Sequence, residues 1–71
     1  MEDYLEKMIG AFVGILKNLG FSKEEVMGIG AFVGENEQMM TEIVDRLEEK
    51  QFKVTTQEAM NIIAQVIKET Q

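Results

Sequence analysis

Carboxylates are the most abundant reactive side chains of this 71-residue chain, which has 13 Asp and Glu residues. Acid–base catalysis by a carboxylate pair needs an apolar setting that raises the pKa of one partner. The close pairs of this sequence stand among polar residues, and they are Glu24/Glu25, Glu35/Glu37 and Glu48/Glu49. A calcium loop needs oxygen ligands at alternate positions, and residues 35–37 supply only a fragment of one. We therefore expect solvated helix charges here.

Other chemistry is restricted by the residue types that the chain lacks. It contains no Cys, His, Trp or Pro. Without Cys there is no disulfide, no thiol nucleophile and no Cys-based zinc site, and without His there is no imidazole base. The hydroxyl groups of Ser22, Thr55 and Thr56 suit helix caps better than catalysis. The sequence predicts no enzyme, no cofactor and no metal site.

The net charge of −6 limits the classes of partner. Arg46 is the only Arg and no basic cluster exists, so binding to nucleic acid or to anionic lipid is disfavoured. The longest uncharged apolar stretch, residues 8–16, is far shorter than the roughly 20 residues that span a bilayer. The first residues are acidic, whereas a signal peptide begins with basic residues. We expect a cytoplasmic protein with no membrane span.

The short chain also limits the size of the hydrophobic core. Hydrophobic residues make up 45% of the sequence, and the length fits a single domain, residues 1–71. Domains below roughly 70–80 residues often need a disulfide, a metal or a partner chain for stability. With no disulfide and no zinc site expected, tight helix packing or self-association remains.

Apolar residues at steps of three and four predict a first helix over residues 2–19. One stripe consists of Leu5, Ile9, Phe12, Leu16 and Leu19. A second stripe lies beside it and consists of Tyr4, Met8, Ala11 and Ile15. Two adjacent stripes predict a broad buried face and a central position for this helix. Gly20 should end the helix, since glycine accepts the left-handed backbone of a helix end.

Capping patterns predict where the later helices begin. Residues 22–25 and 55–58 both fit a capping box, in which a hydroxyl side chain and a Glu satisfy the first backbone N–H groups. Asn36 is a favoured N-cap for a third helix that runs to about Lys50. Glu42 and Arg46 are spaced for an ion pair on that helix.

Apolar positions predict the buried faces of these helices. The expected inward residues are Val26, Ile29, Phe32 and Val33 in the second helix; Met40, Ile43, Val44 and Leu47 in the third; Ala59, Ile62, Ile63, Val66 and Ile67 in the fourth. Gly34 should end the second helix. Residues 51–54 read as an extended connector, with Phe52 and Val54 turned under the bundle. The predicted fold is all-α, an irregular bundle of three or four short helices.

The hexapeptide Ile-Gly-Ala-Phe-Val-Gly occurs twice, at residues 9–14 and 29–34. Each copy has two glycines four apart, which lie on one helix face and allow another helix to approach closely. Gly10 and Gly14 share a stripe with Lys7, where glycine lowers helix stability without a packing reason. We expect a helix contact there. The contact is with another helix of this chain, with a second subunit, or with a ligand or lipid.

The segment Leu19-Gly20-Phe21-Ser22, followed by a helix, Asn36 and a further helix, resembles the ubiquitin-associated domain pattern. In that family a hydrophobic-Gly-Phe loop joins the first two helices of a three-helix bundle and contacts ubiquitin. The resemblance implies that the loop residues and the end of the third helix correspond to Leu19, Gly20, Phe21, Val44 and Leu47. The alternative is that Phe21 is a core residue after a helix-ending glycine.

Taken together, these features predict a small acidic protein–protein interaction module that self-associates through helix faces. The alternative is a ubiquitin-associated-like adaptor that binds through the loop at residues 19–21. The expected partner is a second copy, as a homodimer, or another protein. The candidate interface residues are Gly10, Gly14, Phe21, Gly30 and Gly34.

Overall fold

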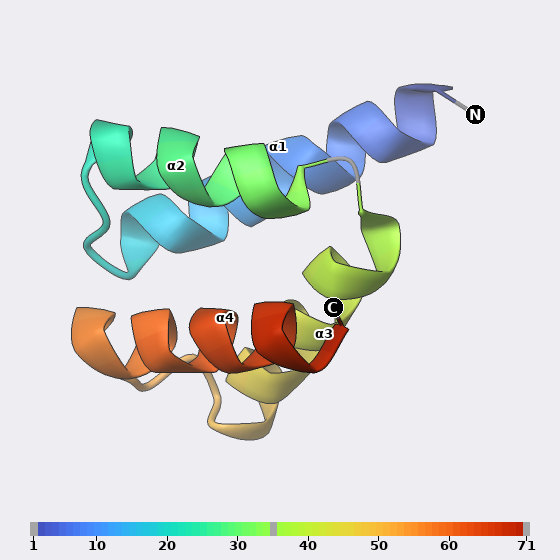
Figure 1. The fold of residues 1–71 in the computed structure, drawn as a ribbon. Coiled ribbons are helices and arrows are strands. Elements are labelled where there is room, and N and C mark those ends of the chain that lie inside the picture. The colour runs from blue at the N-terminus through green and yellow to red at the C-terminus, as the bar shows by residue number, and fades with distance from the viewer. Residues whose placement is uncertain (1, 35, 71) are drawn as a thin grey trace.

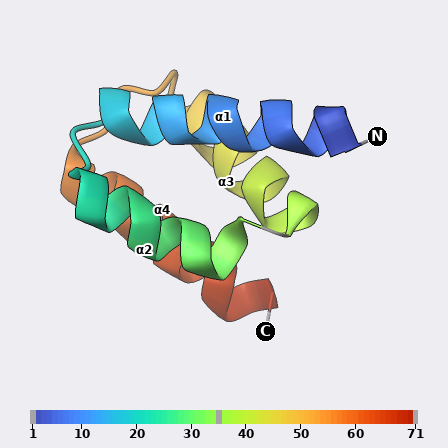
Figure 2. The same ribbon diagram turned by 90° about the horizontal axis from the view of Figure 1, so that it is seen from above.

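The computed structural model describes residues 2–34 and 36–70, and these form four α-helices with no strand (Figure 1). The helices are α1 (Glu2–Asn18), α2 (Lys23–Val33), α3 (Glu37–Glu49) and α4 (Thr56–Thr70). The predicted all-α bundle of short helices is confirmed. Seen from above, α1 crosses α3 and α2 lies over α4, so the helices form two layers (Figure 2).

The predicted helix starts are confirmed by their hydrogen bonds. The backbone N–H of Glu25 donates to Ser22 Oγ at 3.2 Å, and the N–H of Ser22 donates to the Glu25 carboxylate at 2.8 Å. Thr55 and Glu58 form the same reciprocal pair, at 3.0 and 2.8 Å. The backbone N–H of Thr55 lowers the pKa of the Glu58 carboxyl by stabilising its charged form. Asn36 accepts a hydrogen bond from the N–H of Met39 at 3.0 Å.

Helix α1 ends at the predicted glycine. Gly20 has a φ of +94°, and its N–H donates to the carbonyl of Lys17 at 3.1 Å. The N–H of Phe21 donates to the carbonyl of Leu16 at 3.1 Å, which completes a Schellman motif. This left-handed turn directs the chain back across the bundle and leaves Phe21 only 5% exposed.

Helix α3 ends with the same hydrogen-bond pattern but without a glycine. Gln51 and Phe52 have φ values of +57° and +58°, and their N–H groups donate to Glu48 and Leu47 at 2.8 and 2.9 Å. The extended connector predicted for residues 51–54 is therefore wrong at its start. The last carbonyl groups of α3 accept hydrogen bonds from these N–H groups, and the backbone there adopts a left-handed turn. Phe52 is not turned under the bundle and is 39% exposed, whereas Val54 is half-buried.

The core lies between the two helix layers, and α3 contacts each of the other three helices. The buried apolar side chains are Phe12, Leu16, Phe21, Val26, Ile29, Val33, Met39, Met40, Ile43, Leu47, Ala59, Ile63 and Val66. The central helix is therefore α3, and the prediction that α1 occupies this place is wrong. The first stripe of α1 is packed more deeply than the second, since it supplies buried Phe12 and Leu16. In the second stripe, Met8 and Ile15 are half-buried against the core, and Tyr4 and Ala11 are exposed.

Two polar contacts join segments distant in the sequence. Thr56 Oγ1 donates to the carbonyl of Leu19, which ties the start of α4 to the end of α1. Arg46 forms the predicted ion pair with Glu42 at 3.0 Å and a second ion pair with Glu69 of α4. The hydrogen bonds that Arg46 donates to the carboxylates of Glu69 and Glu42 raise the pKa of Arg46. None of the described helices has the length and hydropathy needed to cross a bilayer.

Candidate interaction surfaces

Polar side chains form no enclosed site in the described residues. None of them is buried, and no three carboxylates gather closely enough to hold a metal ion. Glu24, Glu25, Glu48 and Glu49 are all exposed, and Glu35 lies outside the described residues. The surfaces that distinguish this molecule are therefore apolar.

The two copies of the hexapeptide have opposite environments although both are helical. Phe12 is 3% exposed, whereas the corresponding Phe32 is 66% exposed. Val33 is fully buried, whereas Val13 is half-buried. The prediction that Phe32 faces inward is wrong, because α2 packs along the line of Val26, Ile29 and Val33 and leaves Phe32 at the edge.

The glycines of the two copies also differ. A Cβ atom at Gly10 or Gly14 would have no neighbour within 4 Å in the described chain, and both residues are exposed. The alternative in which another helix of this chain crosses α1 here is therefore wrong. A Cβ at Gly30 would likewise meet nothing, whereas one at Gly34 would lie 2.5 Å from the carbonyl oxygen of Gly30. The Gly10/Gly14 face is open surface on the single chain.

An apolar groove of about 320 Å³ runs between α2 and α4, and we call it the α2/α4 groove. Its lining residues are Glu25, Gly28, Ile29, Phe32, Met60, Ile63, Ala64 and Ile67. Buried Ile29 and Ile63 lie at its base, and Phe32 stands exposed beside it. Gly28 and Ala64 keep it open because they carry no side chain beyond one methyl group. In the sequence, Gly28 and Ala64 stand next to the buried stripes of their helices, and these small residues could have indicated the groove. The predicted set of buried residues did not include this possibility.

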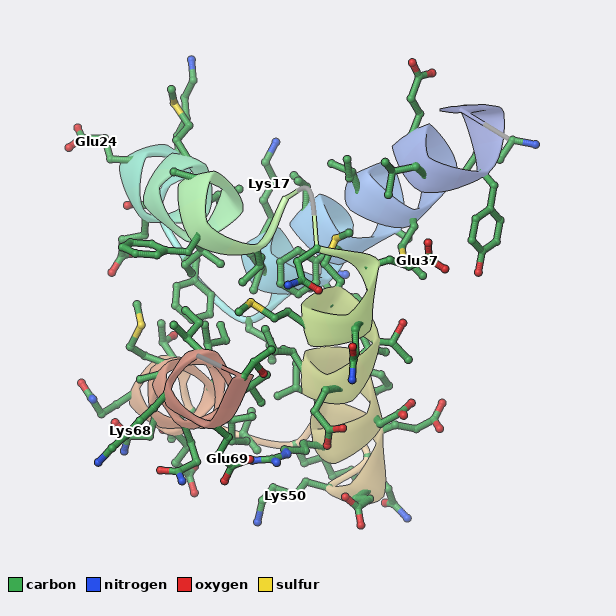
Figure 3. All side chains as sticks on the ribbon, turned by 45° about the vertical axis from the view of Figure 1, so that its right-hand side comes forward. Lys17, Glu24, Glu37, Lys50, Lys68 and Glu69 are labelled. Atoms are coloured by element: carbon green, nitrogen blue, oxygen red, sulfur yellow. The ribbon has the colours of Figure 1, made fainter. Side chains whose placement is uncertain are left out.

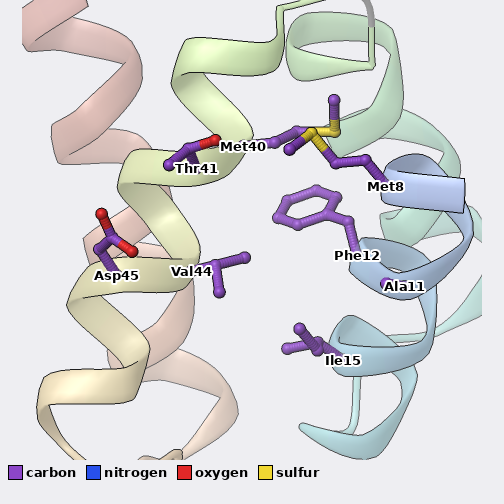
Figure 4. Close-up of a pocket in the computed structure, with 8 residues that line it drawn as sticks. All are labelled: Met8, Ala11, Phe12, Ile15, Met40, Thr41, Val44 and Asp45. Carbon is purple, nitrogen blue, oxygen red and sulfur yellow. The ribbon is translucent and has the colours of Figure 1, made fainter. Parts of the chain in front are cut away.

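A second apolar groove, of about 230 Å³, runs between α1 and α3, and we call it the α1/α3 groove (Figure 4). It is lined by Met8, Ala11, Phe12, Ile15, Met40, Thr41, Val44 and Asp45. Met8 and Met40 approach each other across one end, and Ile15 points toward α3 at the other end. Ile15 also borders an adjoining cavity of about 330 Å³ with Asn18, Leu19 and Phe52. The second stripe of α1 is thus a groove wall.

The loop that resembles the ubiquitin-associated domain has its aromatic ring in the core. Phe21 is buried, which confirms the alternative of a core residue after a helix-ending glycine. Leu19 is half-buried and Gly20 is exposed, so a partner would reach the loop backbone rather than the ring. Leu47 is fully buried and Val44 is half-buried in the wall of the α1/α3 groove.

The five predicted interface residues therefore separate in space. Gly10 and Gly14 are open on α1, Gly30 and Gly34 are half-buried on α2, and Phe21 belongs to the core. The structure adds Phe32 and the two grooves. In comparisons with known proteins, no family model, no curated protein and no solved structure matches the chain.

Proposed function

We propose that this chain is a small acidic protein–protein interaction module that associates with a second copy of itself through the α2/α4 groove. One observation carries the proposal: Phe32 exposes 66% of its surface directly beside an apolar groove. Buried aromatic anchors that fill pockets dominate the energetics of protein interfaces. An exposed Phe next to an open apolar groove supplies both halves of such a contact.

The large exposed surface area of the chain supports association with a partner. The chain exposes 5009 Å², whereas the scaling for monomeric proteins gives about 4500 Å² at a mass of 8.1 kDa. The surplus is comparable to the largest apolar patch of a typical monomer, about 300–600 Å². A standard interface covers about 800 Å² on each partner. The α2/α4 groove and the exposed side chain of Phe32 beside it would form the centre of such an interface.

A two-fold arrangement uses the two features reciprocally. In an isologous dimer, Phe32 of each copy enters the groove of the other copy between Gly28 and Ala64. The rims carry charges of both signs, because Glu24 and Glu25 lie on α2 and Lys68 lies on α4; Glu24 and Lys68 lie on the same side of the molecule (Figure 3). Two copies can therefore meet there without opposing surfaces of a single sign.

Sedimentation equilibrium over a wide range of concentrations tests the proposal. Wild-type protein should approach twice the 8.1 kDa chain mass, and Phe32→Ser should stay at the single-chain mass. Phe52→Ser is the matched control, because it removes an exposed Phe outside the groove and should still dimerise. A wild-type mass that stays at 8.1 kDa, or equal dissociation of the two variants, would contradict the proposal.

The proposed role involves no catalytic step, cofactor or metal, and the cytoplasm is the proposed compartment. The exposed positions of the described carboxylate pairs support the non-catalytic role, since none of them lies in an apolar pocket. Fractionation of cells that express a tagged chain would test the compartment. Recovery of the tagged chain in a membrane or secreted fraction would contradict that part of the proposal.

A further inference from the structure

Exposed apolar side chains extend the α1/α3 groove at both ends. Tyr4 is 59% exposed at the N-terminal end, and Phe52 is 39% exposed next to the adjoining cavity. Between them lie Met8, Ala11 and Ile15. From Tyr4 to Ile15 the helix rises about 16 Å, which matches three turns of a second helix. The exposed strip therefore has the length of a short helical ligand.

The size and the lining of the groove suit apolar side chains. Its volume of about 230 Å³ exceeds the roughly 150 Å³ that accommodates a benzene-sized group. Met8 and Met40 form one end of the groove (Figure 4). Unbranched methionine side chains adapt readily to apolar ligands of different shape. The groove can therefore accept apolar side chains of more than one kind.

The α3 rim of this groove is acidic. Asp45 lines it, and Glu37 and Glu48 lie four residues before Thr41 and four after Val44, on the same side of α3. All three carboxylates are exposed, and among the described residues none of them forms a salt bridge. Lys7, a helix neighbour of Ala11, is the cation on the α1 side. The carboxylates outnumber it.

This charge pattern separates the two grooves by the kind of partner that each accepts. A second copy at the α1/α3 groove would bring two acidic rims together, in a chain that already carries a net charge of −6. Like charges that face each other across an interface disfavour association. A cationic partner would instead be attracted by the rim. The α2/α4 groove, with two carboxylates and one Lys at its rims, has a smaller acidic excess.

We propose that the α1/α3 groove binds an amphipathic helix of another protein whose apolar stripe is flanked by Lys and Arg residues. Its apolar side chains, spaced by three and four residues, pack along Met8, Ala11 and Ile15. Its basic side chains face Glu37, Asp45 and Glu48. This inference does not rest on self-association, because it concerns the other groove.

Fluorescence anisotropy with a labelled amphipathic peptide of about 14 residues, four helical turns, tests the inference. The peptide carries Leu at helical spacing and Lys on its other face. Ala11→Glu places a charge in the groove, and Ala31→Glu places the same charge at the same position of the other hexapeptide. Both alanines are exposed, and Ala31 lines neither groove. The two variants have equal net charge.

Wild-type protein should bind the peptide saturably, and a peptide with Glu in place of Lys should not bind. Ala11→Glu should weaken binding about tenfold, which corresponds to about 1.4 kcal/mol. Ala31→Glu should bind like the wild type. Absent binding, or equal weakening in both variants, would overturn the inference. An altered mass of Ala11→Glu alone would also overturn it, since the groove would then be a subunit interface.

A second pair of variants tests the rim independently of the groove floor. Glu48→Lys reverses a charge on the groove side of α3, whereas Glu6→Lys reverses an exposed charge on α1 that lies three or four positions from no residue lining the groove. Glu48→Lys should weaken peptide binding several-fold more than Glu6→Lys at low salt, and added salt should reduce the difference. Circular dichroism checks that each variant is folded. Equal weakening of peptide binding by the two variants would mean that only long-range charge attraction acts on the peptide, and this would contradict the proposed site.

Discussion

The two copies of Ile-Gly-Ala-Phe-Val-Gly share sequence and helical structure but bury different residues. The copy in α1 buries Phe12, whereas the copy in α2 buries Ile29 and Val33 and exposes Phe32. Six identical residues therefore determine the local backbone but not the face that meets the core. The Phe of the first copy contributes to the interior of the bundle, and the Phe of the second copy contributes to the surface through which we propose that it associates.

Residues one or two turns away explain the difference. Phe12 is followed four residues later by Leu16, and Leu5 precedes it by seven, so it lies within a continuous apolar stripe. The positions seven and four residues before Phe32 are Glu25 and Gly28. A helix turned to bury Phe32 would also bring Glu25 toward the core, where an unpaired charge is costly. The α2 helix is therefore rotated onto Val26, Ile29 and Val33.

Truncation of the two Phe residues should give the largest contrast. Phe12→Ala should lower the free energy of unfolding by about 3–5 kcal/mol, enough to unfold a domain of marginal stability. Phe32→Ala should change it by no more than about 0.5 kcal/mol in dilute, monomeric protein. Urea unfolding followed by circular dichroism measures both values. Similar losses of unfolding free energy in the two variants would contradict the different burial of the two Phe side chains.

The Val residues should show the reverse order at smaller magnitude. Val33→Ala removes two methyl groups from a fully buried side chain and should cost about 2 kcal/mol. Val13 is half-buried, so Val13→Ala should cost less than half as much. The same urea experiment compares them. A larger loss of unfolding free energy in Val13→Ala than in Val33→Ala would mean that Val13 is more deeply buried than the structure shows.

Substitution of the last glycine of each copy should change the free energy of unfolding with opposite signs. Gly14→Ala should raise the free energy of unfolding by about 0.8–1 kcal/mol, because the new methyl group enters open space and alanine favours helix. Gly34→Ala should lower it by about 1–3 kcal/mol, because its Cβ would meet the carbonyl oxygen of Gly30. Thermal melts measure both signs. If Gly14→Ala melted lower and lost dimer mass, the Gly10/Gly14 face would be a subunit contact.

Much of the backbone could be predicted from the sequence because its signals are local. The N-caps form hydrogen bonds to residues only three positions along the chain, as in Ser22, Asn36 and Thr55. Gly20 ends α1 within one turn. The ion pair of Glu42 and Arg46 is likewise one turn long. Such features depend on neighbours that the sequence displays directly.

The parts that could not be predicted depend on packing between helices. An apolar stripe shows that a face can be buried, but not whether another helix covers it, as Tyr4 and Ala11 illustrate. The second partner of Arg46, Glu69, is 23 residues away. The left-handed turn at Phe52 contains no glycine, so the sequence gives no local indication of it. The grooves lie between distant segments and therefore emerge only in the folded chain.

Association through the α2/α4 groove can be observed with an isotope-filtered NMR experiment on a mixture of labelled and unlabelled protein, which detects contacts between subunits only. The proposed dimer should show contacts from the ring of Phe32 in one copy to the methyl groups of Met60 or Ala64 in the other. Intersubunit contacts from Gly14 or Met8 in their place, or a dimer in which Phe32 shows none, would contradict it.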